Sequence, residues 1–128
     1  MSLTMEDERK LVSMILQGNK NARYAAVSDS EGKIISDEHR SNEENILTLD
    51  ETKAMLLRAI QNWKIRENIS PKVGKGQYAI VTYEKIKRIT VPLPDDHLLF
   101  VSVDSDKDDH IKDIMKSITY VQNLVKNA

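Results

Sequence analysis

The sequence predicts one α/β domain of the α+β type, in which a five-stranded antiparallel sheet is flanked by three helices in the order α-β-β-α-β-β-β-α. The first observation is that stretches with helical spacing of apolar residues alternate with strand-like stretches in this order. The second is that three strand-like stretches follow one another with short turns, which favours an antiparallel meander. The third is the length, because 128 residues fit a single domain, 1–128, with its own core.

The first part of the chain predicts a helix followed by a hairpin. Residues Glu6–Asn19 carry apolar side chains at helical spacing, and Gly18 supplies a stop signal near their end. Arg23–Ser28 is strand-like, and Lys33–Ser36 is a short second strand. Between them, Gly32 can take the left-handed conformation that closes a hairpin.

A second helix is predicted after the polar segment Asp37–Asn45, which is expected to be a loop. Thr48 and Glu51 have the spacing of a capping box, which marks a helix start. Pro71 limits the helix, since the residue before a proline avoids helical dihedral angles, and Ser70–Gly76 is expected to be a flexible connector. The apolar face of this helix consists of Met55, Leu56, Ala59, Ile60 and Trp63.

Three strands are predicted next, at Gln77–Glu84, Lys87–Leu93 and Leu98–Asp104. The third is the most apolar run of the chain, so we expect it to be the central strand. Pro92 lacks a backbone donor and therefore marks an edge or a strand end. Pro94–His97 is a turn signal.

A last helix is predicted to begin in the acidic run Asp106–Asp109 and to carry an apolar stripe from Ile111 to Val125. We expect the second helix to pack on one face of the sheet. The first and last helices should lie together on the other face or at its edge.

Composition excludes several classes of function. The chain has no cysteine, which rules out disulfides, thiol catalysis and cysteine-ligated metal sites. No apolar run approaches the ~20 residues of a transmembrane helix, and Met1–Lys10 lacks the apolar core of a signal peptide. A cytoplasmic protein without membrane contact is expected.

Charge is distributed unevenly along the chain. Lys53–Arg88 holds nine basic and two acidic residues, so this segment carries +7 and the remainder −8. Such polarity favours electrostatic steering of a partner or of a second copy. The alternative is that these side chains only solvate helix and strand exteriors.

Candidate metal and phosphate motifs fail on geometry. Asp104–Asp108 resembles the start of a calcium loop, but Asp109 stands where glycine is needed and Met115 where glutamate is needed. Lys72–Gly76 resembles a phosphate loop, but a helix precedes it and a strand follows, the reverse of a P-loop. The three histidines, which lack metal-ligand spacing, are His39, His97 and His110. We expect no metal and no cofactor.

No motif for catalysis is present. There is no G-x-S-x-G, and the acidic residues fall in solvated turns, so neither an enzyme nor a catalytic residue is expected. The basic stretch Lys64–Arg88, with Tyr78 and Tyr83, suggests single-stranded nucleic acid, but the overall pI of 6.3 weighs against it.

The order of elements resembles the roadblock/dynein light-chain group within the profilin-like and longin-like architecture. The segment A-A-V-S-D-S-E-G-K-I-I-S, Ala25–Ser36, is similar to the opening hairpin of that group, and L-L-F-V-S-V, Leu98–Val103, to its last strand. The chain also resembles small uncharacterised archaeal proteins in K-I-K-R-I-T-V-P-L and D-D-H-L-L-F-V-S-V.

The roadblock resemblance implies a dimer, either of two copies or with a relative. It also implies small GTPases or motor complexes as partners, and a scaffolding or regulatory role without catalysis. The chain departs from the group in its charged second helix and its lysine-rich connector.

The first functional hypothesis is therefore a non-enzymatic interaction module, a homodimer linked to a GTPase or a signalling complex. Its surface would be the outward face of the second helix or a sheet edge at Lys87–Leu93. The basic residues assigned to this surface are Lys64, Lys85, Lys87 and Arg88. The alternative is a small-ligand sensor of PAS or Cache type, with a pocket lined by Trp63, Tyr78 and Phe100. Nucleic-acid binding ranks third.

Overall fold

The computed structural model describes residues 3–40, 47–105 and 111–126. Its helices are α1 (Met5–Gly18), α2 (Leu49–Glu67), α3 (Ser70–Val73) and α4 (Ile111–Lys126), with a short 3-10 turn η1 (Pro94–Asp96). Its strands are β1 (Ala22–Ser28), β2 (Ile34–His39), β3 (Ala79–Thr82), β4 (Ile86–Pro92) and β5 (Leu98–Asp104). The predicted fold class and chain order are confirmed, and α3 is an addition to them.

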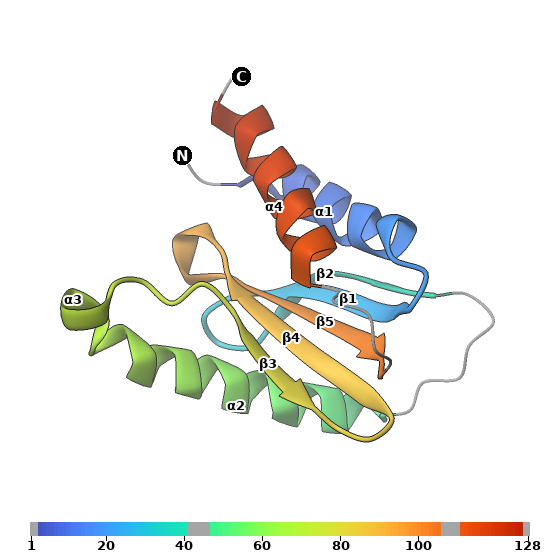
Figure 1. The fold of residues 1–128 in the computed structure, drawn as a ribbon, viewed down its shortest axis with the longest axis horizontal. Helices are drawn as coiled ribbons and strands as arrows, with labels where there is room; N and C mark the ends of the chain where they lie inside the picture. Colours follow the sequence, from blue (N-terminus) through green and yellow to red (C-terminus); the bar gives the residue numbers. More distant parts are fainter. Residues whose placement is uncertain (1–2, 41–46, 106–110, 127–128) are drawn as a thin grey trace.

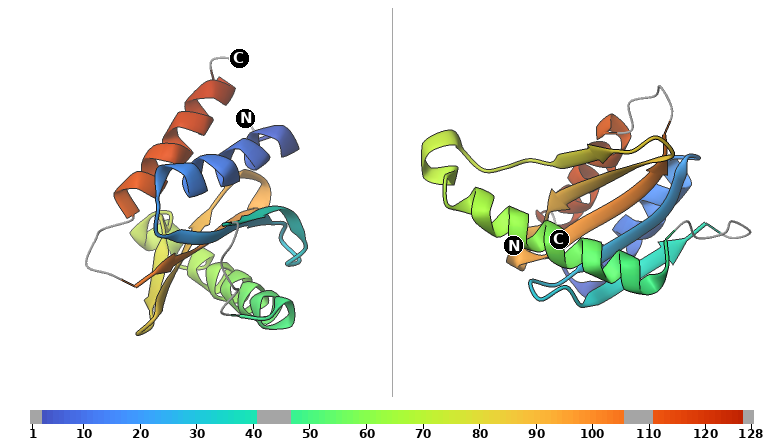
Figure 2. Two further views of the ribbon diagram at one scale, coloured as in Figure 1. Left: turned by 90° about the vertical axis from the view of Figure 1, so that its right-hand side faces the viewer. Right: turned by 90° about the horizontal axis from the view of Figure 1, so that it is seen from below.

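The five strands form one antiparallel sheet in the order β2-β1-β5-β4-β3. The prediction that Leu98–Asp104 is the central strand is confirmed, because β5 lies between β1 and β4. Figures 1 and 2 show α2 across one face of the sheet and α1 with α4 on the other. This arrangement confirms the predicted placement of the helices.

The larger part of the core lies between the sheet and the pair α1 and α4. Successive side chains of β5 point to opposite faces of the sheet, so this strand contributes to the core on both sides. Leu99 and Val101 belong to the larger cluster, whereas Leu98 and Phe100 face α2. Beneath α2 there are two smaller clusters, Leu56 with Phe100 and Trp63 with Leu98. The α2 face is therefore covered less completely than the opposite one.

Both long helices that precede the meander begin in capping boxes. The Thr48 hydroxyl accepts a hydrogen bond from the Glu51 N–H at 3.1 Å, and the Glu51 carboxylate accepts one from the Thr48 N–H at 2.9 Å. This confirms the sequence prediction. Thr4 and Asp7 make the same arrangement at α1, which was not predicted.

The connector after α2 was predicted wrongly as flexible throughout. Residues Ser70–Val73 form the short helix α3, with Pro71 in its first turn, where a missing N–H costs no hydrogen bond. The Gly74 N–H donates to the Ser70 carbonyl at 2.8 Å and ends it.

The predicted boundaries of the first hairpin also need correction. Strand β2 continues to His39, into the segment expected to be a loop, because Asp37 and Glu38 pair with Ala26 and Ala25 of β1. Polar residues are tolerated there because β2 is an edge strand with one side open to solvent.

The predicted sheet edge at Lys87–Leu93 was wrong. Strand β4 pairs with β5 on one side and with β3 on the other, so it is internal and β3 takes the edge. Pro92 is the last residue of β4, which agrees with its interpretation as a strand end. Asp106–Asp109 and His110 lie outside the described residues.

Candidate interaction surface

Strand β3 offers a free edge. Among the described residues it pairs with β4 alone, in the register Ile80 to Ile89 and Val81 to Arg88. Its β-branched residues favour an extended backbone, yet Ile80 is 43% and Val81 48% exposed. An exposed strand edge with apolar side chains on both faces is a template for pairing with another chain.

A second exposed apolar group lies on the C-terminal end of α2 and on α3. It consists of Ile65, Ile69 and Val73, which are between 53% and 72% exposed. Ile65 lies on α2, Ile69 in the turn between α2 and α3, and Val73 at the end of α3. We refer to β3 together with these three residues as the apolar surface.

The two parts of the apolar surface lie on the side of the molecule away from α1 and α4 (Figure 1). Trp63, near the end of α2, packs with Ala79 at the start of β3. Figure 1 shows α3 at one extremity of the molecule and a connector running back from it to β3, all on the side away from α1 and α4. An exposed apolar area of this kind commonly marks a binding surface.

The four basic residues predicted for an interaction surface lie in this half of the chain but do not share one face. Lys64 is exposed on α2, and Lys85 is exposed in the turn between β3 and β4. Lys87 and Arg88 are consecutive in β4 and so point to opposite faces of the sheet. Their role in partner binding stays a prediction.

Arg88 is held in place by aromatic rings on the α2 side of the sheet. Its guanidinium carbon lies 5.0 Å from the centroid of the Tyr83 ring and 5.9 Å from that of Phe100. It also donates a hydrogen bond to the Tyr83 hydroxyl at 2.9 Å. These contacts orient a positive charge beside the exposed Val81.

The three residues predicted for a ligand pocket lie in different surroundings. Trp63 is buried against Ile60 and Leu98, and its indole N–H donates to the Thr90 hydroxyl at 2.9 Å. Phe100 packs in the separate cluster with Leu56. Tyr78 is 44% exposed just before β3. Their joint role as ligand contacts stays a prediction.

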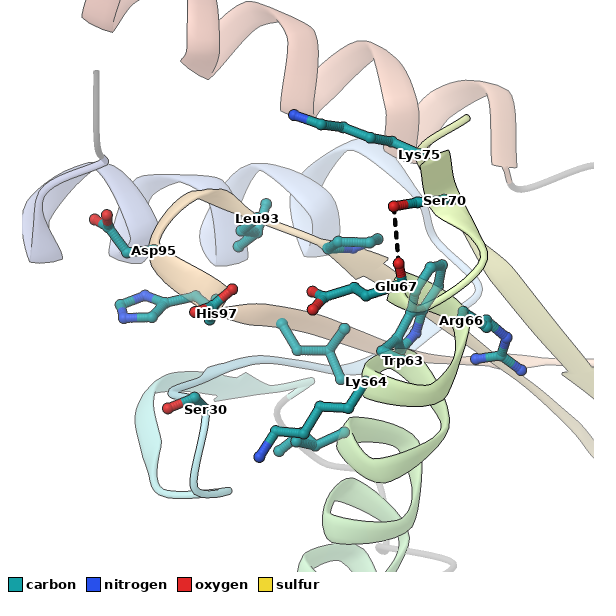
Figure 3. Close-up of a pocket in the computed structure, with 15 residues that line it drawn as sticks. Ser30, Trp63, Lys64, Arg66, Glu67, Ser70, Lys75, Leu93, Asp95 and His97 are labelled. Atoms are coloured by element: carbon teal, nitrogen blue, oxygen red, sulfur yellow. Dashed lines mark hydrogen bonds between the residues drawn. The ribbon is translucent and has the colours of Figure 1, made fainter. Parts of the chain in front are cut away.

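A cavity of about 530 Å³ lies at the C-terminal end of α2 (Figure 3). Trp63 lines it, whereas Tyr78 and Phe100 do not. Its other walls come from the connector after α3, from the corner between β4 and β5, and from Ser30 in the first hairpin. The cavity was not predicted, because no local signal in the sequence joins four such distant segments.

One corner of the cavity is fixed by a buried acid. His97 Nδ1 lies 2.7 Å from a carboxylate oxygen of Glu8, and Glu8 is only 1% exposed. This contact ties α1 to the turn before β5. Within the described residues, no group of three or more acidic, histidine or cysteine side chains could hold a metal ion. No helix there is long and apolar enough to cross a bilayer.

The architecture defines a class of protein: an α+β domain with the fold of the Roadblock/LC7 domain. The sequence matches no family model and no curated protein. Solved structures, however, are similar over most of the chain. The Roadblock/LC7 domain from Streptomyces avermitilis has a TM-score of 0.68 at 13% identity, over 93% of this chain and 95% of that one.

Two of the solved structures that are similar to this chain are MglB proteins. The MglB of Thermus thermophilus has a TM-score of 0.68 at 14% identity, over 91% of this chain and 89% of that one. The MglB of Myxococcus xanthus has a TM-score of 0.70 at 12% identity, over 96% and 90%. The resemblance to roadblock domains is thereby confirmed, and at this identity the shared feature is the fold.

Proposed function

We propose that this chain is a non-enzymatic interaction module that works as a homodimer through the apolar surface, and that the dimer regulates a small GTPase or a signalling complex. The observation that carries the proposal is the free edge of β3 with Ile80 and Val81 exposed. Two β3 strands pairing across a two-fold axis would join two sheets into one.

The exposed residues Ile65, Ile69 and Val73 support the same proposal. Edge-to-edge pairing of a four-residue strand satisfies few backbone groups, so a stable dimer needs additional apolar burial. The end of α2 lies beside the start of β3 and can supply it. A similar structure of MglB, with a TM-score of 0.70, is described as having a tetrameric arrangement, which supports self-association as a use of this fold.

Light scattering on the wild type and on two variants tests the homodimer. Val81→Lys and Ile65→Lys each place a charge on the apolar surface, and both side chains are exposed enough to leave the fold intact. We expect a wild-type dimer and at least tenfold weaker association in either variant, since an unpaired charge would be buried. Tyr120→Lys is the matched control, because Tyr120 is 55% exposed on α4.

A wild type that stays monomeric over a wide concentration range would contradict the proposal. A dimer whose affinity is unchanged by Val81→Lys and Ile65→Lys but is lowered by Tyr120→Lys would contradict it as well.

The GTPase link is tested separately. Each small GTPase encoded by the source organism is loaded with GDP or with a non-hydrolysable GTP analogue and titrated into the protein. A regulator should bind one of them in one nucleotide state at least tenfold more tightly than in the other. Binding to none, or equal binding in both states, would remove this part of the proposal and leave the homodimer standing.

A further inference from the structure

None of the residues that line the cavity at the end of α2 belongs to the apolar surface, although both features use α2 and α3. The cavity is within the size range of small-molecule sites. Its walls come from α2, the connector after α3, the β4–β5 corner and the first hairpin, so its shape is set by the tertiary fold.

The floor of the cavity is apolar and fixed. Ile60, Trp63 and Leu98 form a buried cluster there. The Trp63 ring cannot turn freely, because its N–H is bonded to Thr90. Gly76 passes close to the ring: a Cβ at this position would lie 2.4 Å from Trp63 Cζ3. A flat apolar group could therefore rest on a preformed surface.

The rim carries charges of both signs. Figure 3 shows the Glu67 side chain turned toward the cavity, with Lys64 and Lys75 on opposite sides of it, whereas the His97 ring turns away from Glu67. The Arg66 guanidinium lies over the Trp63 ring, 4.9 Å from its centroid. Within the described part of the chain, no ion pair is formed by Lys64, Glu67 or Lys75. These charges are thus available to groups of a ligand.

The turn that closes the cavity has an unusual backbone. Asp95 and Asp96 both adopt positive φ angles, 63° and 59°, which only a few per cent of non-glycine residues do. Both residues line the cavity. Strain of this kind is tolerated where the surrounding structure holds it, and here the Glu8–His97 contact anchors the next residue.

We propose that this cavity binds a small zwitterion with an apolar body, of the class of the α-amino acids with aromatic or large aliphatic side chains. The apolar body lies on the floor formed by Ile60, Trp63 and Leu98. The ligand carboxylate is held by Lys75, and its ammonium by Glu67 with the acidic turn at Asp96. The sequence left a small-ligand sensor as the alternative function, and this proposal names the class of its ligand. Of the three residues predicted to line a ligand pocket, only Trp63 lines this cavity.

Titration calorimetry with three related probes tests the ligand class. L-phenylalanine carries both charges, 3-phenylpropionate lacks the ammonium, and 2-phenylethylamine lacks the carboxylate. We expect saturable binding of L-phenylalanine and about tenfold or more weaker binding of the other two, since each loses one set of charge-assisted hydrogen bonds. Trp63 is the only tryptophan, so its emission should change on binding as well.

Variants locate the site. Lys75→Gln and Glu67→Gln should each weaken L-phenylalanine binding about tenfold. Both side chains are exposed, so folding should be unaffected. The matched controls Lys72→Gln and Glu84→Gln remove the same charges at exposed positions that do not line the cavity, and should bind like the wild type.

Two outcomes would overturn the inference. One is no saturable binding of L-phenylalanine or L-leucine up to about 10 mM. The other is binding of 3-phenylpropionate as tight as that of L-phenylalanine, which would make the cavity an anion site. The oligomeric state is measured separately, so failure here would not be confused with failure of the proposed homodimer.

Discussion

At the scale of single residues, Trp63 joins α2 to the sheet by both packing and a hydrogen bond. It is 8% exposed, and so is Thr90, whose hydroxyl accepts the indole N–H. The apolar stripe of α2 predicts that Trp63 is buried, and the structure confirms it. The partner on β4 has no sequence signal, because it lies 27 residues away.

Removing both partners of this hydrogen bond should cost less than the sum of removing each one alone. Trp63→Phe leaves the buried Thr90 hydroxyl unpaired, and Thr90→Val leaves the indole N–H unpaired, each at about 1–3 kcal/mol for the unpaired group. The double variant should be less destabilised than the sum of the two single variants. Urea unfolding of the four proteins measures this, and strictly additive free energies would contradict the contact.

Tyr24 is the residue with the clearest response to pH. Burial raises the pKa of its hydroxyl above the ordinary value, and the neighbouring Asp37 carboxylate raises it further. The hydroxyl donates to that carboxylate at 3.0 Å. In the unfolded chain a tyrosine ionises near pH 10. Above that pH the folded state therefore binds more protons than the unfolded state, and stability falls as pH rises.

Tyr24→Phe should make the free energy of unfolding less dependent on pH in this range. Above pH 10 the slope of the free energy of unfolding against pH should become shallower by up to about 1.4 kcal/mol per pH unit, which corresponds to one bound proton. Denaturant unfolding between about pH 9 and 11 measures the slope. Tyr120→Phe is the control, because Tyr120 is 55% exposed. Equal slopes in both variants would show that Tyr24 is not responsible.

At the scale of elements, the capping boxes explain where the two long helices begin. Each satisfies two backbone donors that an uncapped helix would leave to water. The hydrogen bond from the Thr48 N–H lowers the pKa of the Glu51 carboxyl, and that from the Thr4 N–H lowers the pKa of Asp7. The stabilisation of the folded state by each of these hydrogen bonds is present at neutral pH. It is lost as the pH falls through the lowered pKa of the carboxyl concerned.

Thr48→Ala should destabilise the protein by about 0.5–2 kcal/mol, because the Glu51 N–H loses its acceptor. Thr48→Asp retains an acceptor and should cost much less. Thermal unfolding of both variants at neutral pH measures the difference. If Ala and Asp prove equally destabilising, the cap contributes nothing through its side chain.

The strands show where elements depend on their neighbours. Lys87–Leu93 and Gln77–Glu84 both contain Ile, Val and Thr, and the prediction of an edge at Lys87–Leu93 chose the wrong one of the two. In the structure β4 has a partner on each side, whereas β3 contracts to four residues with one partner among the described strands. The pairing partner of a strand is a long-range property, so the sequence pattern predicts a strand but not its place in the sheet.

At the scale of the whole molecule, the uneven charge bears on self-association. The segment Lys53–Arg88 carries +7 and contains most of α2, all of α3 and β3, and the start of β4. A two-fold contact at β3 brings two such segments together, and their repulsion is screened by salt. A contact between the basic segment of one copy and the acidic remainder of another would be attractive, and salt would weaken it.

The proposed homodimer should therefore become tighter as salt is added. We expect the dissociation constant to fall severalfold between about 50 and 500 mM NaCl, where the Debye length shrinks to a few ångströms. Sedimentation equilibrium at the two salt concentrations measures it. A dimer that weakens with salt would point to contact between opposite charges and would contradict pairing at β3.

Local patterns were sufficient for the type and order of the main elements. Apolar periodicity, the Thr48 cap and the turn at Gly32 act over a few residues, so they can be recognised in the sequence. The burial of β5 on both faces also follows from its composition, and with it the central place of this strand.

The candidate sites required the tertiary structure. The free edge at β3 exists because β4 pairs on both sides, and the cavity beside Trp63 exists because four distant segments meet there. The Glu8–His97 contact joins residues 89 positions apart. Such contacts leave no periodic signal, because their energies depend on distances in space that are set only when the helices pack against the sheet.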